Sequence, residues 1–428
     1  MEQLLYHIWK YGLYEGKELR TTSGERFEVI DAGIYNPNSG PDFFNAKIRS
    51  GHTVWAGNIE IHQYSSDWYQ HQHHKDKTYD SVILNVVMRH DSEIYRTNGE
   101  KIDQFVMQIS DRLLSDYAFL QDHSPSVIPC AFRLGEISEV ILSDWKTSLG
   151  MERILNKSER VKLLVDRYAG NWEEAFYVLL ARSFGTGINS EPFERLARSL
   201  PLSYLLKHID SLLQTEAFLF GQAGFLEDEE CRHPYYQLLQ REYALLRAKF
   251  RLTPLPRSMW RFFRLRPASF PQVRIACLAA LLHTYPRLFS TFITAGSLQE
   301  LKKPFQISLH AFWENHYQFD SVSVEKNKGL GFQTVESILI NTLIPVLFAY
   351  AGRTDQVVFE ERAVDFLESL SPENNMYVRA WQSAGISVKN AFDSQAVIQL
   401  QKEYCDQKKC LYCRIGHQLL ASESKCRT

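Results

Sequence analysis

The sequence lacks the features that mark a protein as exported, membrane-bound or strongly charged. Its 428 residues carry a net charge of only −2, so the composition gives no overall bias towards nucleic acids or membranes, and any basic surface must be local. The N-terminus has no basic start followed by an apolar run, which excludes a typical signal peptide. Cysteine is scarce, with seven residues. Without an export signal, this favours a cytoplasmic protein with reduced thiols.

Long hydrophobic runs are also missing. The longest apolar stretch lies near residues 337–351, where Asn341 and Pro345 interrupt it. It is too short to span a bilayer, which needs about 20 apolar residues, so we predict a buried core helix there. Apolar residues still make up 45% of the chain, and we therefore expect a globular protein of two or three domains.

The apolar pattern divides the chain into regions of different texture. Residues 2–12 have the spacing of an amphipathic helix, and residues 81–89 form a nearly continuous apolar run that is typical of a central strand. Further strands are expected at 18–21, 26–32, 93–96 and 104–108. From about residue 137, apolar residues recur at helical spacing instead. We therefore predict an α/β domain over residues 1–125, a large mostly α-helical domain over 126–395 and a cysteine-containing segment over 396–428.

Residues 40–62 have the pattern of a β-hairpin and are the most informative part of the chain. With a turn at 50–52, Arg49 faces Thr53, and counting back along both arms places Asp42 opposite Glu60. Directly opposed residues share a face, and His62 shares it too because it lies two residues beyond Glu60. Two acids held so close need a proton or a divalent cation between them.

These residue types suit a metal-dependent phosphodiesterase. Asp42 and Glu60 would hold Mg²⁺ or Mn²⁺, with the backbone carbonyl of Ile61 as an extra ligand, and His62 would orient or activate water. A different metal-dependent hydrolase would use the same groups. In the structural alternative, Asp42 caps a turn after Pro41, and Glu60 and His62 are an ordinary polar strand end.

Pro41-Asp42, a hairpin and then Glu60-Ile61-His62 resemble the PD-(D/E)XK nuclease superfamily. The resemblance implies a restriction-endonuclease-like mixed sheet, with Asp42, Glu60 and His62 as the catalytic residues for phosphodiester hydrolysis in DNA or RNA. Relatives carry lysine where this chain has His62, and histidine is charged only below about pH 6.5 unless its pKa is shifted. The alternative function is a non-catalytic nucleic-acid-binding or scaffold protein with a degenerate nuclease-like domain.

Nearly the whole chain is also similar to an uncharacterised bacterial family with a domain of unknown function. The similarity rests on Gly40-Pro41-Asp42-Phe43, on residues 57–62, and on residues 65–68 with His71 and His73. It continues through residues 84–87, where we expect histidine at the position of Asn85. The family brings little established function with it.

Histidine is concentrated in one part of the chain. Six of the fourteen histidines lie between residues 52 and 90. Imidazole and carboxylate groups bind transition metals well, so we expect His71 or His73, with Asp76, to support the acidic site or to contact substrate. The alternative is a solvated loop whose histidines cap helix ends or stack on Trp68 and Tyr69.

A basic stretch spans residues 241–274, with nine Lys and Arg residues against the single acid Glu242 and with aromatic residues between them. Arginine binds phosphates, and aromatic rings stack on exposed bases. We therefore predict a nucleic-acid surface formed by Arg257, Trp260, Arg261, Arg264 and Arg266. In the alternative, the aromatics face a core and the arginines flank it.

Three cysteines, Cys405, Cys410 and Cys413, fall within nine residues. Such short spacings let thiolates share a structural metal, with His417 or Cys426 as the fourth ligand. The spacing also matches three ligands of a ferredoxin-type cluster, although we favour zinc over iron–sulfur. In the alternative these cysteines only pack in a core, which is also our expectation for the others, Cys130, Cys231 and Cys277.

Overall fold

The computed structural model describes residues 1–421 except 17, 123, 125, 126 and 327. The chain forms two compact units. The first combines Met1–Trp145 with the chain from Leu400 onward, and the second is Lys146–Gln399. The cysteine-containing C-terminal segment therefore belongs to the same unit as the N-terminus.

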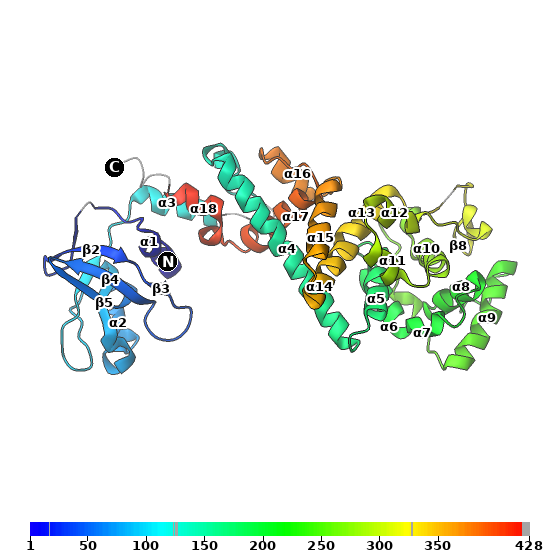
Figure 1. The fold of residues 1–428 in the computed structure, drawn as a ribbon, viewed down its shortest axis with the longest axis horizontal. Helices are drawn as coiled ribbons and strands as arrows, with labels where there is room; N and C mark the ends of the chain where they lie inside the picture. The colour runs from blue at the N-terminus through cyan, green and yellow to red at the C-terminus, as the bar shows by residue number, and fades with distance from the viewer. Residues whose placement is uncertain (17, 123, 125–126, 327, 422–428) are drawn as a thin grey trace. The chain divides into compact units, whose positions relative to one another are not determined.

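The first unit is built on a mixed sheet, which confirms the predicted α/β N-terminal region. Its strand order is β1-β2-β4-β5-β6-β7, and β3 pairs with β4. The strands β2, β4 and β5 are antiparallel and lie side by side in Figure 1, whereas β5, β6 and β7 are parallel. The strands are β1 (Leu19–Arg20), β2 (Arg26–Asp31), β3 (Ile34–Tyr35), β4 (Phe43–Ser50), β5 (Thr53–Tyr64), β6 (Val82–Arg89) and β7 (Gln104–Val106). The strand expected at 93–96 is reduced to an isolated bridge between Tyr95 and Lys101.

The β4–β5 hairpin brings Asp42 to Glu60 through two deviations that cancel. Its turn is shorter than predicted, because Ser50 rather than Arg49 pairs with Thr53. A β-bulge then adds one residue to β4, so that Phe43 pairs with Ile59. The bulge includes Asn45 at φ 56°, in the left-handed region that asparagine enters more readily than most residues. The next step along both strands therefore joins Asp42 and Glu60.

The helices of the first unit pack on the sheet or on one another. They are α1 (Glu2–Tyr11), α2 (Asp67–Gln70), α3 (Asp111–Gln121) and α18 (Arg414–Ala421). Both α1 and α2 pack against β5. The inner face of α1 buries Leu4, Leu5 and Ile8 completely, and each such side chain contributes roughly 1.5–3 kcal/mol. Helix α18 packs against α3. Figure 1 shows the two helices side by side, α18 in red and α3 in cyan.

The second unit is mostly helical, as predicted. The long helix α4 (Glu139–Arg167) begins in the first unit and continues into the second. It is followed by α5 (Trp172–Phe184), α6 (Ser190–Ser199), α7 (Leu202–Leu205), α8 (Leu212–Gln222), α9 (Pro234–Phe250), α10 (Pro271–Thr284), α11 (Leu288–Thr294), α12 (Leu298–Lys302), a small hairpin of β8 (His316–Gln318) and β9 (Ser321–Val322), α13 (Phe332–Ile338), α14 (Ile344–Thr354), α15 (Val357–Ser369), α16 (Met376–Ser383) and α17 (Ala391–Gln399). Helix α10 is buried from Pro271 to Leu282, so it is the centre of this core.

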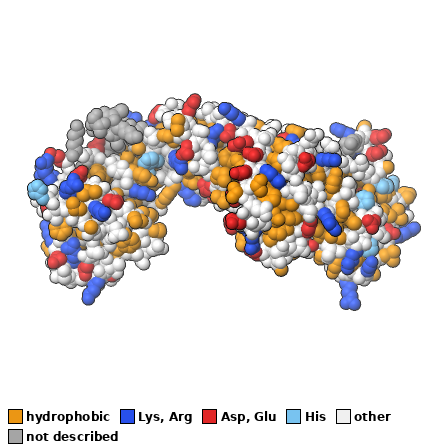
Figure 2. Space-filling model, in the orientation of Figure 1, with side chains coloured by type: hydrophobic (Ala, Val, Ile, Leu, Met, Phe, Trp, Pro, Cys, Tyr) orange, Lys and Arg blue, Asp and Glu red, His pale blue; other side chains and the backbone are white. Residues whose placement is uncertain are grey.

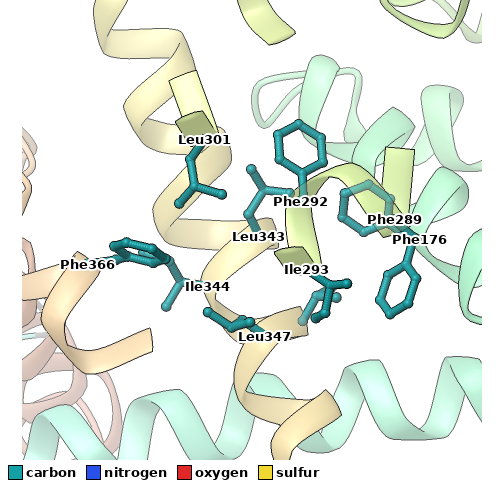
Figure 3. A pocket seen from close by; sticks show the side chains of 10 residues that line it. Phe176, Phe289, Phe292, Ile293, Leu301, Leu343, Ile344, Leu347 and Phe366 are labelled. Carbon is teal, nitrogen blue, oxygen red and sulfur yellow. The ribbon is translucent and has the colours of Figure 1, made fainter. Parts of the chain in front are cut away.

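The interior of the helical unit is closely packed. Figure 3 shows aromatic and aliphatic side chains from α5, α11 and α14 around a cavity of about 10 Å³. That volume holds about one water-sized sphere. The cavity is a packing defect of the core and leaves no room for a ligand.

The apolar segment Phe332–Thr354 is a core helix, as predicted. By length and composition it is able to cross a membrane, yet 78% of its most apolar window is buried inside the protein. A π-helical turn at Leu339–Leu343 interrupts it just before Pro345. Proline has no N–H to continue the helical ladder, which accounts for the irregular turn.

Candidate metal centre

Asp42 and Glu60 are joined by hydrogen bonds between carboxylates and backbone. The N–H of Asp42 donates to Glu60 Oε2 over 3.1 Å, and the N–H of Ile61 donates to Asp42 Oδ2 over 2.9 Å. Asp42 also shares a side-chain hydrogen bond with Tyr6 of α1. These contacts fix both carboxylates and leave Glu60 Oε1 available on the side of the histidines.

Three imidazole rings gather beside Glu60. Ring nitrogens of His62, His71 and His73 all lie within 4.8 Å of one another. The Nε2 atoms of His73 and His62 lie 3.2 and 3.7 Å from Glu60 Oε1. Both Nε2 atoms are buried and have no hydrogen-bond partner in the part of the chain that the structure describes. Three imidazole groups are therefore placed to share one ion, and Glu60 Oε1 lies beside two of them.

The segment after β5 folds the outer two histidines back onto the strand. Helix α2 packs on β5, and Gln72 then takes a left-handed φ of 62° between His71 and His73. This turn brings both side chains towards His62. The ring of His73 stacks on Tyr79 at 3.8 Å and meets the edge of the buried Trp68 at 5.2 Å, so its orientation is fixed by packing.

His62 is oriented by a chain of amide side chains from the parallel strands. Its Nδ1 lies 3.0 Å from Asn85 Oδ1. The amide N–H of Gln104 donates to Ser92 O, so Gln104 Oε1 is the atom that accepts from Asn85 Nδ2, at 3.4 Å. Asn85 therefore turns Oδ1 towards His62, where it accepts a hydrogen bond. The proton of His62 is therefore on Nδ1, and Nε2 presents a lone pair to Glu60, as in histidines that bind metals.

The pKa values at this point reflect burial without a cation. Burial raises the pKa of Glu60 to about 8. Burial, together with the charge of Glu60, raises the pKa of Asp42 to about 7. Burial lowers the pKa of His62 and of His73 to about 4. A divalent cation among these groups would favour the ionised carboxylates and the neutral imidazoles alike.

The donor set is richer in nitrogen than the acidic site expected from the sequence. One carboxylate oxygen with three imidazole nitrogens suits Zn²⁺ or Mn²⁺ better than Mg²⁺, which prefers oxygen ligands. We do not count Asp42 among these donors, because its carboxylate already accepts hydrogen bonds from Ile61 and Tyr6.

Asp76 is placed outside the cluster. It is exposed, and its Oδ1 accepts from the N–H of Thr78 over 2.9 Å, so that it caps the short 3₁₀ turn Lys77–Ser81. Asp76 therefore caps this turn, and its charge also acts on the pKa of His73, so its supporting role at the site stays a prediction.

The basic stretch divides into core and surface. Trp260 is only 5% exposed and donates its indole N–H to Ala223 O, so it is a core residue and is not available to stack on bases. Arg257, Arg261, Arg264 and Arg266 are exposed. No carboxylate within 4.0 Å of these four arginines is found in the described chain. Phe263, which is 80% exposed beneath Arg264, is the aromatic ring at the surface. Figure 2 shows Lys and Arg side chains where α9 lies in this unit.

The three C-terminal cysteines are buried in the first unit. His417, expected as a fourth ligand, places its Nδ1 3.1 Å from Nε2 of His7 in α1. Cys426 lies outside the described residues. His417 therefore contacts His7 through one ring nitrogen, and its role as a ligand beside the cysteines stays a prediction.

A cavity of about 230 Å³ in the first unit is lined by two neighbours of Asp42, namely Tyr6 and Phe43. Tyr6, which is bonded to Asp42, and Phe43, which follows it, form one wall, and Tyr412 lies on another. Its other lining residues include Tyr11, Tyr35, Lys10 and Arg414. Aromatic rings and two cations thus surround a space next to the acidic pair.

Sequence reasoning missed Tyr6 and Tyr79, and it assigned no role to Asn85. Asn85 carried a readable signal, because it is a polar residue in an otherwise apolar strand and in register with Glu60 of β5. Tyr6 and Tyr79 carried none, since an aromatic residue at a half-buried position is ordinary.

Comparison with known proteins adds a family and no activity. A protein-family model described as Protein of unknown function (DUF2851) matches residues 2–376. No curated protein and no solved structure matches the chain.

Proposed function

The chain belongs to that family, whose description assigns no activity, and we propose from its own site that it is a metal-dependent hydrolase that cleaves phosphodiesters in nucleic acid. The observation that carries the proposal is the convergence of Glu60 Oε1 with the buried Nε2 atoms of His62 and His73, which make no hydrogen bond of normal geometry in the described chain. Buried polar atoms without partners are rare in folded proteins and call for a specific explanation.

Glu60, His62 and His73 would hold a Zn²⁺ or Mn²⁺ ion, with the exposed His71 at the solvent side. When bound, such an ion supplies a Lewis acid that makes water acidic enough to attack near neutral pH. Asp42 is suited to accept a proton from that water, because its carboxylate lies beside Glu60 and is held by the N–H of Ile61. The hydrogen bond with Tyr6 keeps the Asp42 carboxylate in place.

His62 takes a different role here from the one expected where relatives carry lysine. Its pKa of about 4 keeps it neutral at pH 7, so it cannot supply the permanent positive charge of an ammonium group. We assign it to metal binding instead, which its tautomer and its bond with Asn85 support.

The strand topology supports a nuclease-like reaction. Three antiparallel strands, β2, β4 and β5, are followed by a helical segment and by β6, which pairs in parallel with β5. The acids lie at the end of the hairpin, as in the PD-(D/E)XK nucleases that this region resembles. The alternative function, a non-catalytic binding protein, would have the same fold but would not hydrolyse phosphodiesters.

The surroundings of the site support a nucleic-acid substrate. The cavity lined by Tyr6 offers aromatic rings for stacking and Lys10 and Arg414 for phosphate contacts. The exposed arginines of the helical unit offer a second, independent set of phosphate contacts.

The test combines metal binding with cleavage. The wild type is titrated with Zn²⁺ and Mn²⁺, and labelled single- and double-stranded oligonucleotides are incubated with each ion and with Mg²⁺. We expect Glu60→Ala and His73→Ala to lose tight metal binding and at least 100-fold in turnover. His52→Ala, which changes an exposed histidine at the hairpin turn, should match the wild type. Oligonucleotide binding without cleavage, unchanged by Glu60→Ala, would instead establish the non-catalytic function.

A further inference from the structure

A fourth cysteine joins the three near the C-terminus. Cys130 lies just before the short 3₁₀ turn Ala131–Glu136, far from residues 405–413 in sequence. Like Cys405, Cys410 and Cys413, it is present as a buried thiol of the first unit. Four of the seven cysteines of the chain are therefore collected in one small region.

Specific contacts bring the two stretches together. The thiol of Cys410 donates to Leu120 O at the end of α3 over 3.5 Å, and Gln401 donates to Val127 O over 3.5 Å. Helix α18 packs against both α3 and the turn that follows Cys130. The thiols are near enough for their charges to interact: burial, then Cys413 and Cys410, raise the pKa of Cys130 to about 12. Burial and then the other three cysteines raise the pKa of Cys405.

Hydrogen-bond donors are directed at one of these sulfurs. Burial raises the pKa of Cys413, but the backbone N–H groups of Gly416 and Ile415 and the indole N–H of Trp145 act in the opposite direction. That indole N–H is buried, in a side chain only 7% exposed, and it is directed at the sulfur of Cys413. A neutral thiol is a weak acceptor for three donors, whereas a metal-bound thiolate is commonly surrounded by N–H groups.

We propose that Cys130, Cys405, Cys410 and Cys413 together bind a soft metal centre, an iron–sulfur cluster or a zinc ion. Thiolate ligands select these centres. His417 is not needed, since its ring is directed at His7. The centre would join the loop after α3 to the C-terminal segment, and it does not depend on the hydrolase function proposed above.

The sulfurs are spread more widely than the ligands of a single zinc ion. Ligand atoms of one tetrahedral zinc ion lie about 3.8 Å apart, given Zn–S bonds of about 2.3 Å. Among the described residues, no three cysteine sulfurs lie within 4.8 Å of one another. An iron–sulfur cluster holds its thiolates farther apart than a single ion does.

The experiment measures metal in the full-length protein purified without oxygen. We expect about one cluster, seen as iron, acid-labile sulfide and visible absorption, or about one equivalent of zinc if the ion is the occupant. Cys130→Ser should lower the metal content at least tenfold, whereas Cys231→Ser, a half-buried cysteine of the helical unit, should not. Wild type without iron or zinc, or Cys130→Ser with full metal content, would overturn the proposal.

A second measurement protects the test against misfolding of the variant. X-ray absorption of the metal in the wild type reports its ligands directly. Four sulfur ligands from the protein support the assignment of Cys130. Three sulfurs with one nitrogen would restore His417 and refute it.

Discussion

The buried carboxyl group of Glu60 gives the metal-free protein a stability that depends on pH. Its pKa is about 8 in the folded protein, because burial penalises its charge, against 4.5 for an ordinary glutamate. The folded state therefore holds this proton more tightly than the unfolded chain does. The contribution of Glu60 is largest at acid pH and is lost as the pH rises from about 4.5 to 8.

The magnitude follows from the size of the shift. One pKa unit corresponds to about 1.4 kcal/mol, so the whole shift from 4.5 to about 8 amounts to roughly 5 kcal/mol over that interval. Glu60→Gln removes the titration and keeps the shape of the side chain. Relative to this variant, the wild type should lose about 1.4 kcal/mol of unfolding free energy for each pH unit across the window.

The assay is hydrogen exchange of the β5 and β6 amides without metal at half-unit steps from pH 5 to 8.5, corrected for the intrinsic exchange rate. These amides report the opening of the first unit separately from the helical unit. Saturating Zn²⁺ should then stabilise the wild type more strongly as the pH rises, because the ion displaces the proton, and should barely stabilise Glu60→Gln.

Glu216→Gln is the matched control. Glu216 is a buried carboxyl group of the helical unit, where burial raises its pKa to about 7 and Tyr235 and Trp313 hydrogen bond to it. Its loss should leave metal stabilisation unchanged. Parallel pH curves for wild type and Glu60→Gln would refute the reasoning, because Glu60 would then titrate like an exposed glutamate.

Three further predictions test other parts of the structure. Asn85→Ala should weaken Zn²⁺ affinity by about 10–100-fold, because His62 loses the partner that fixes its tautomer; calorimetric titration measures this, and unchanged affinity would contradict it. Gly57→Ala should lower the unfolding free energy by about 1–3 kcal/mol, since a Cβ there would lie 2.3 Å from Ile83 Cγ2, whereas Gly135→Ala, with open space around it, should be nearly neutral in urea denaturation. Replacing Arg257, Arg261, Arg264 or Arg266 by alanine should reduce the salt dependence of oligonucleotide binding by about one unit of slope for each lost phosphate contact. Fluorescence anisotropy over a salt series measures that slope; Arg195→Ala, an arginine paired with Glu191, is the control, and equal slopes in all variants would argue against this surface.

The acidic hairpin shows how far local pattern reaches. Alternation predicted two strands and an opposed Asp42 and Glu60, and the pair is indeed joined by hydrogen bonds. The predicted register of the hairpin was wrong in detail, because the turn is one residue shorter than predicted. The bulge at Asn45 then restores the alignment of Asp42 with Glu60. Bulges depend on single residues that enter the left-handed region, and alternation alone does not reveal them.

The residues of the candidate metal centre were only partly predictable from the sequence. The density of histidines suggested that His71 or His73 faces the acids. That both rings reach His62 depends on the left-handed backbone of Gln72 and on stacking against Tyr79. These are tertiary effects, and no periodicity in the sequence encodes them.

The helical unit was predictable where helices are long and amphipathic. The helical spacing after residue 137 predicted helices, and α5 over Trp172–Phe184 is one of them. Apolar spacing alone does not show where one helix ends and the next begins, as at the break between α7 and α8. Ser211 caps α8 by accepting from the N–H of Gln214, a capping pattern that outweighs the apolar spacing. The sequence alone could not link Cys130 to the other cysteines, because ligand spacing identifies only cysteines that are close together in sequence.

The return of the chain to the first unit after Gln399 has a consequence for synthesis. The strands and histidines of the candidate centre leave the ribosome early. Cys405, Cys410 and Cys413, and the wall of the cavity formed by Tyr412 and Arg414, emerge only after all of the helical unit. The nascent protein can therefore form its sheet early, but it cannot complete the cavity that Tyr412 and Arg414 line until the helical unit has been translated.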